Sequence, residues 1–124
     1  MAIALTNNTN DVFAGGFSSY ALTHTISSGS DRLLLVFVTF NNETTPVVTG
    51  IVWDAAGANE ALTKIDGYVT IDDGAVDAYY LIAPSVGSVK DITVTLDKAM
   101  TRSISIIAFS LTGVDQTSPI ADYD

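Results

Sequence analysis

The stretch Leu33-Leu34-Leu35-Val36-Phe37-Val38-Thr39-Phe40 decides the fold. Its first residues are apolar on both faces of an extended chain, whereas a strand with one wet face would alternate between apolar and polar residues. Turn-forming residues precede it at 27–31, and a polar segment at 41–46 ends it. We therefore predict a buried central strand over residues 32–40.

Other short β-type runs lie on both sides of this strand, and turn residues separate them at nearly regular spacing. Three of them alternate cleanly, at residues 19–26, 89–96 and 103–111. Further strands are expected at residues 3–6, 47–53, 61–65, 68–71 and 75–83. The sequence thus predicts an all-β chain of about eight strands. We expect one antiparallel β-sandwich, jelly-roll or Ig-like, that spans residues 1–124.

Length and composition favour one folded domain and exclude two kinds of partner. The chain has 124 residues, of which 48% are hydrophobic and 15% charged, a profile typical of globular proteins. It carries 5 basic and 14 acidic residues, so a net charge of -9 would repel nucleic-acid phosphates and anionic lipid. No apolar run reaches the roughly 20 residues that span a bilayer. We expect neither nucleic acid nor a membrane as a partner.

Cysteine usage and the first residues narrow the chemistry further. The chain contains no cysteine, which removes disulfides, thiolate nucleophiles and thiol-ligated zinc. Residues 1–8 have no basic segment, and their apolar stretch ends after Leu5. We therefore expect no cleaved signal peptide.

Catalytic residues are not expected. The one histidine, His24, would need a nucleophile and an orienting acid, and the serines and threonines show no nucleophile-elbow motif. The alternation of its strand already explains His24 as a half-buried packing residue. We predict a protein that is not an enzyme and that has no catalytic residue and no cofactor.

An acidic group next to a glycine offers one weak metal-binding hypothesis. Asp72, Asp73 and Asp77 carry the oxygen ligands that Ca²⁺ prefers, and Gly74 would let the backbone bend. However, Asp-Gly is ordinary turn chemistry, and the spacing differs from an EF-hand loop. A turn is the favoured interpretation, and a calcium site is the alternative.

Aromatic residues near a long loop offer a second binding hypothesis. Trp53 directly precedes the loop at residues 54–60, and long loop tips often carry recognition sites. Trp53, Asp54, Asn59 and Tyr79 are therefore candidates for contact with a sugar. Strand aromatics pack in cores more often than they bind ligands, so core packing is favoured for the two rings.

Four segments in the same order resemble a known domain family. They are residues 27–36, 61–65, 78–84 and 109–120, which include the strings Ser-Gly-Ser-Asp-Arg-Leu-Leu and Gly-Val-Asp-Gln-Thr-Ser-Pro-Ile. Together they resemble a β-sandwich domain found in bacterial surface proteins and in structural proteins of phages and environmental viruses. The resemblance covers residues 17–120 and implies a fold rather than a function. Similar domains usually continue with further strands, which leaves two alternatives: a neighbouring chain completes the sheet, or this is a complete smaller sandwich whose edges are protected by Thr and Asp.

The resemblance and the composition leave two function classes. The first is a non-enzymatic structural protein of a virion, such as a phage capsid decoration or cement protein or another assembly component. It would form a homo-oligomer or bind other virion proteins. The alternative is a carbohydrate-binding or adhesive module of a surface or tail-fibre protein, located outside the cell or on its surface, with a glycan as ligand.

The two ends of the chain are the expected assembly contacts. We predict extended arms at residues 1–10 and 114–124, because both lie outside the strongest strand pattern. Their apolar side chains would be exposed to water in a lone sandwich and would be buried against a neighbour. The alternative is a frayed, acidic tail, which is common at chain ends. The candidate contacts are Ile3, Leu5, Val114, Ile120 and Tyr123.

Overall fold

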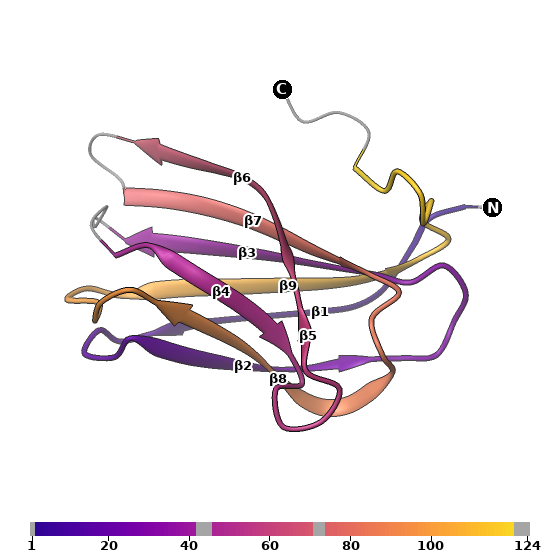
Figure 1. Ribbon diagram of the computed structural model, residues 1–124, viewed down its shortest axis with the longest axis horizontal. Helices are drawn as coiled ribbons and strands as arrows, with labels where there is room; N and C mark the ends of the chain where they lie inside the picture. Colours follow the sequence, from indigo (N-terminus) through magenta and orange to yellow (C-terminus); the bar gives the residue numbers. More distant parts are fainter. Residues whose placement is uncertain (1, 42–45, 71–73, 121–124) are drawn as a thin grey trace.

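The computed structural model describes residues 2–41, 46–70 and 74–120, and these residues form nine strands and no helix (Figure 1). The strands are β1 (Ala4–Phe13), β2 (Ser19–Ile26), β3 (Leu33–Asn41), β4 (Val48–Trp53), β5 (Glu60–Ala61), β6 (Thr63–Thr70), β7 (Gly74–Ile82), β8 (Gly87–Leu96) and β9 (Ile104–Thr112). They build a five-stranded sheet in the order β1-β9-β3-β7-β6 and a four-stranded sheet in the order β2-β8-β4-β5. All neighbouring strands are antiparallel. The prediction of an antiparallel β-sandwich is confirmed.

Strand β3 occupies the centre of the five-stranded sheet, between β9 and β7. Its inward side chains are almost fully buried, from Leu34 to Phe40 at every second residue. Leu35, Phe37 and Thr39 lie on the outer face and are only half-buried. The predicted central strand is therefore confirmed, but burial on both faces is limited to its first residues.

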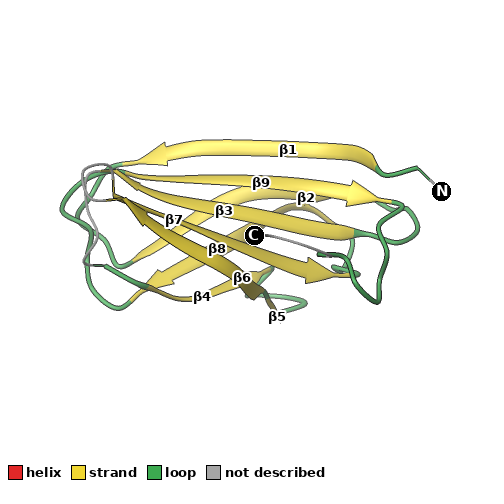
Figure 2. Ribbon diagram, turned by 90° about the horizontal axis from the view of Figure 1, so that it is seen from above, coloured by secondary structure: helices red, strands yellow, loops and turns green. Residues whose placement is uncertain are grey.

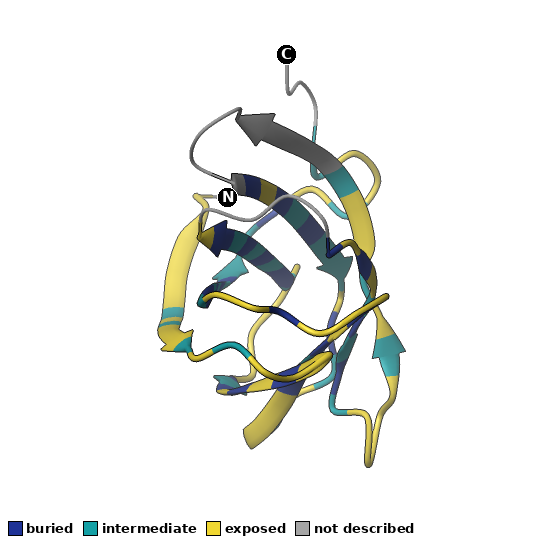
Figure 3. Cartoon of the chain, turned by 90° about the vertical axis from the view of Figure 1, so that its left-hand side faces the viewer, coloured by how far each residue is buried: buried dark blue, intermediate teal, exposed yellow. Residues whose placement is uncertain are grey.

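The core lies between the two sheets and is built from inward side chains of both. The buried residues lie on strands of both sheets (Figure 3). The alternation expected for β2, β8 and β9 is confirmed, since their inward residues are buried except at the start of β8 and at the last residue of β9. The largest fully buried side chains are Trp53 and Phe40. Within the part of the chain that the structure describes, every buried side-chain nitrogen and oxygen has a hydrogen-bond partner. The interior is thus closed, and its polar groups are satisfied.

Strand β1 is longer than the sequence indicated. A strand was expected at residues 3–6, but β1 runs to Phe13 and pairs with β9 along its length, with a bulge between Leu5 and Asn7. Most of its side chains are exposed, so its polar residues lose little hydration and show no apolar alternation. The prediction of an extended arm at residues 1–10 is wrong for residues 4–10, which belong to the sheet.

Strand β6 replaces two of the expected strands. Residues 61–65 and 68–71 were assigned to separate strands around an Asp66-Gly67 turn. In the structure Gly67 lies inside β6, opposite Asp77 of β7, and a bulge between Lys64 and Asp66 absorbs the irregularity. A bulge produces the same break in alternation as a turn, which explains the error.

The two distinctive sequence strings meet at one end of the sandwich. The Gly113 and Val114 amides donate to the carbonyl oxygens of Ser30 (3.2 Å) and Asp31 (3.1 Å). The Gln116 side chain donates to the Arg32 carbonyl oxygen at 3.2 Å. These bonds fasten the segment after β9 to the turn before β3. The strings that carry the family resemblance therefore have a structural role here.

These hydrogen bonds hold the start of the predicted C-terminal arm against the domain. Val114 was expected to be wet in the lone chain, but it is buried, with 5% of its surface exposed. Ile120 is half-buried, and Tyr123 lies outside the described residues. The arm is therefore contradicted at Val114, because its side chain already packs against its own domain.

Replacement of Gly113 by alanine tests the fastening. Gly113 has a φ of 72°, and a Cβ atom there would collide with the carbonyl oxygen of Ala2. We expect Gly113→Ala to lower the free energy of unfolding by more than about 1 kcal/mol in urea titrations. Gly50→Ala is the control, because the Cβ position at Gly50 is open. Equal effects of the two substitutions would contradict the role assigned to Gly113.

Candidate functional site

The first candidate site is a buried histidine that joins the two sheets. His24 points inward from β2, and its Nε2 atom lies 2.6 Å from Ser110 Oγ of β9. Its Nδ1 atom lies 2.8 Å from Thr9 Oγ1 of β1. The ring also meets Trp53 edge to face, with the centroids 6.2 Å apart. The expected half-buried packing residue is in fact fully buried and held by two hydroxyl groups.

A hydroxyl partner at each nitrogen suits a neutral imidazole. A neutral ring has one donor nitrogen and one acceptor nitrogen, and a hydroxyl group can complement either. Burial lowers the pKa of His24 below its ordinary value of 6.5, because it penalises the charged form. Ser110 is also buried, with 2% of its surface exposed, so a substrate does not reach its hydroxyl. The Ser–His contact therefore serves as a polar link between the sheets.

The lowered pKa of His24 predicts a pH dependence of stability. The unfolded chain takes up a proton near pH 6.5, while the folded chain resists protonation. Stability should therefore be full above pH 6.5 and fall as the pH drops below that value. His24→Gln removes this titration but keeps one donor and one acceptor. We expect urea unfolding between pH 7.5 and 5.5 to show a smaller pH dependence in this variant, and an unchanged dependence would contradict the assignment.

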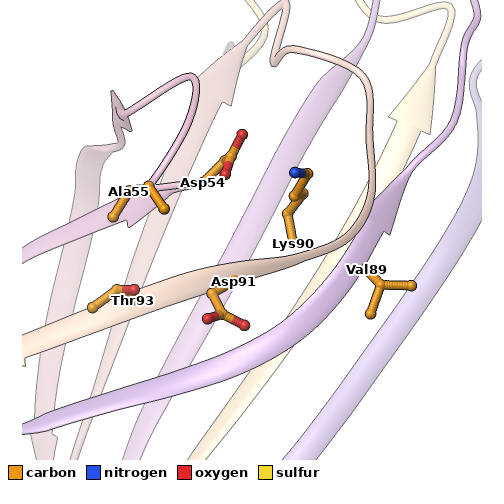
Figure 4. Close-up of a pocket in the computed structure, with 7 residues that line it drawn as sticks. Asp54, Ala55, Val89, Lys90, Asp91 and Thr93 are labelled. Atoms are coloured by element: carbon orange, nitrogen blue, oxygen red, sulfur yellow. The ribbon is translucent and has the colours of Figure 1, made fainter.

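The second candidate site is a surface hollow beneath the loop after β4. It has a volume of about 250 Å³ and lies between this loop and the first half of β8 (Figure 4). Its lining residues are Asp54, Ala55, Ala56, Val89, Lys90, Asp91 and Thr93. Asp54 shapes the loop, because one carboxylate oxygen accepts the Ala58 amide at 3.0 Å. The hollow therefore combines two carboxylates with one ammonium group.

The sugar-contact residues proposed from the sequence do not come together. Trp53 is fully buried, and its Nε1 atom donates to the Ser85 carbonyl oxygen at 2.9 Å. Tyr79 is buried in the core as well. Neither ring can stack on a sugar, so core packing is the correct interpretation for both. Asp54 lines the hollow, whereas Asn59 is exposed and does not line it.

The proposed calcium ligands are only partly described. Asp72 and Asp73 lie outside the described residues. Asp77 is buried, and its carboxylate lies 3.5 Å from Lys64 Nζ. Burial, together with this negative charge, raises the pKa of neighbouring Tyr79 to about 12. Among the described residues no three metal-ligating side chains cluster, and Asp77 serves in an ion pair.

The third candidate site is an aromatic cluster that sequence reasoning missed. Phe13 ends β1, Phe17 precedes β2, and both rings contact Tyr20, with centroids 5.7 Å and 6.1 Å away. Phe17 is 63% exposed. A hollow of about 300 Å³ is lined by Phe13, Ala14, Phe17, Ser19, Tyr20 and Ala21. The sequence signal that could have predicted this cluster is the pair Phe13 and Phe17, because Gly15-Gly16 between them is typical of a turn that brings the two rings together.

Exposed apolar side chains gather near the same strand. Eight large hydrophobic residues are exposed in the described part of the chain, and four of them lie on β1 or close to its ends. These four are Ile3 (64%), Leu5 (54%), Val12 (64%) and Phe17 (63%). The predicted contacts Ile3 and Leu5 are thus exposed and available to a neighbouring chain, although Leu5 belongs to the sheet and not to an arm.

Comparisons with protein-family models, curated proteins and solved structures give no match. The family resemblance noted in the sequence therefore stays a prediction. None of the described residues forms a helix long and apolar enough to cross a membrane.

Proposed function

We propose that the protein is a non-enzymatic structural component of a virus particle, such as a phage capsid decoration or cement protein. The main support is the placement of exposed apolar residues. Ile3, Leu5, Val12 and Phe17 gather along one edge of the sandwich, where they are available to a neighbouring subunit. Large apolar side chains left exposed at both ends of one edge strand are surface that a neighbouring subunit can cover.

The closed interior supports the same proposal. His24, Trp53 and Ser110 are all buried, and their polar atoms form hydrogen bonds to other groups of the same domain. The hollows of about 250 and 300 Å³ lie at or below the lower end of the range typical of small-molecule sites. A rigid domain with an adhesive edge suits a shell component better than it suits a ligand-binding enzyme.

A carbohydrate-binding or adhesive module is the second candidate. It is favoured by the exposed Phe17 ring and by the polar hollow at Asp54, Lys90 and Asp91. Proteins commonly bind sugars by stacking an aromatic ring on the sugar and by accepting hydrogen bonds from its hydroxyl groups with carboxylates. They lie in two separate hollows with no lining residue in common, which makes this function the weaker proposal.

Analysis of purified particles tests the two proposals. Virus particles from the source of the sequence, banded on a density gradient, should contain this chain in many copies by quantitative mass spectrometry. The particle proposal is wrong if the chain is abundant in the same sample but absent from the particle band. On a glycan array, binding that Phe17→Ala or Asp54→Ala abolishes would favour the second candidate instead.

A further inference from the structure

We propose that β1 is a pairing edge through which two copies of this chain form one continuous antiparallel sheet. The partner is thus a second copy of the chain, related by a two-fold axis perpendicular to the five-stranded sheet. This inference does not require the pair to belong to a virus particle.

One side of β1 is free for pairing. Among the described residues β1 pairs with β9 alone, and Figure 2 shows it as the outermost strand of its sheet. The Val12 amide donates to the carboxylate of its neighbour Asp11 at 2.8 Å, so it is not part of the ladder with β9. Since alternate residues of a strand direct their backbone groups the same way, Asn8 and Asn10 also face the free side. Their amides and carbonyls form a template for another strand.

The other three sheet edges are less suited to pairing. Strand β5 has two residues, and the sequence of β6 includes the charged residues Lys64 and Asp66. Strand β2 is flanked by β1, because the Asn7 side chain donates to the Thr25 carbonyl oxygen at 2.9 Å. Charges and coverage are the usual means by which proteins protect an edge.

Strand β1 has few of these protections. It contains no lysine and no proline, and Asp11 is its one charged residue. The bulge between Leu5 and Asn7 bends its first part, which leaves residues 7–13 as the regular segment. A strand of this kind is expected to pair when copies meet.

The distribution of side chains along β1 suits a second copy of the same strand. Apolar residues lie at both ends, with Ile3 and Leu5 at the start and Val12 and Phe17 at the finish, and polar residues lie between them. An antiparallel two-fold arrangement brings the start of one strand to the finish of the other. Both apolar ends are then covered at once, as an isologous interface requires.

The charge distribution also directs two copies to this edge. Each chain carries a net charge of -9, so copies repel one another over most of their surface. Strand β1 holds one of the 14 acidic residues, which makes it a region of weak repulsion. Added salt screens the repulsion, so it should strengthen pairing.

Sedimentation velocity of the full chain tests the proposal. The wild type is expected to sediment as a dimer that tightens with salt. Asn10→Pro removes an outward amide, and Asn10→Lys adds a charge to the edge, so each should weaken dimerisation by roughly tenfold or more. Ser28→Lys, at an exposed position in the turn before β3, is the charge-matched control and should leave the dimer intact. Circular dichroism verifies that each variant is folded.

Cysteine cross-linking locates the axis, because the chain has no cysteine of its own. Asn8→Cys, Asn10→Cys or an equal mixture of the two should form an intermolecular disulfide rapidly, since paired strands place Cα atoms within disulfide range. Ser28→Cys is the control and should not. The proposal is overturned by a monomeric wild type, or by a dimer that resists both Asn10 variants and gives no β1 cross-link. A monomer found in many copies on particles would refute the pairing but not the particle proposal.

Discussion

The packing of alternate side chains between two sheets is the interaction on which the rest of this structure depends. Strand β3 lies at the centre of the larger sheet, and its inward residues meet those of β4 and β8 across one core. Because Trp53 and Phe40 fill that space, the domain has a closed interior. Recognition is therefore left to the surface, and in a sandwich the edge strands are the part of the surface with unpaired backbone groups.

The hydrogen bonds around His24 help to attach β1 to the opposite sheet. Thr9 contacts the His24 ring and Asn7 contacts the backbone of β2, so the inner side of β1 is tied to the other sheet. The side chains of β1 bury little surface, and its attachment rests largely on these contacts and on the ladder with β9. Strand β1 is thus attached to β9 along one edge and to β2 through its inward side chains, while its outer edge is free for pairing.

Much of the fold could be predicted because burial imposes a period of two on the sequence. This period located β2, β3, β8 and β9 to within about two residues. It failed for β1, whose exposed polar residues have no period, and for β6, where a bulge imitates a turn. The candidate site was harder to predict, because pairing partners far apart in the sequence decide exposure. The general preference of strand aromatics for the core predicted the burial of Trp53, but the sequence did not reveal that Phe17 is exposed next to β1.

Amide hydrogen exchange, followed by NMR at low and high protein concentration, tests the central claim that the outer side of β1 is a pairing edge. The amides of β3 should be protected at both concentrations, because they lie inside a sheet. The amides of Asn8 and Asn10 should exchange rapidly in dilute protein and slowly in concentrated protein. If their exchange is the same at both concentrations while β3 stays protected, the account of β1 as a pairing edge is wrong.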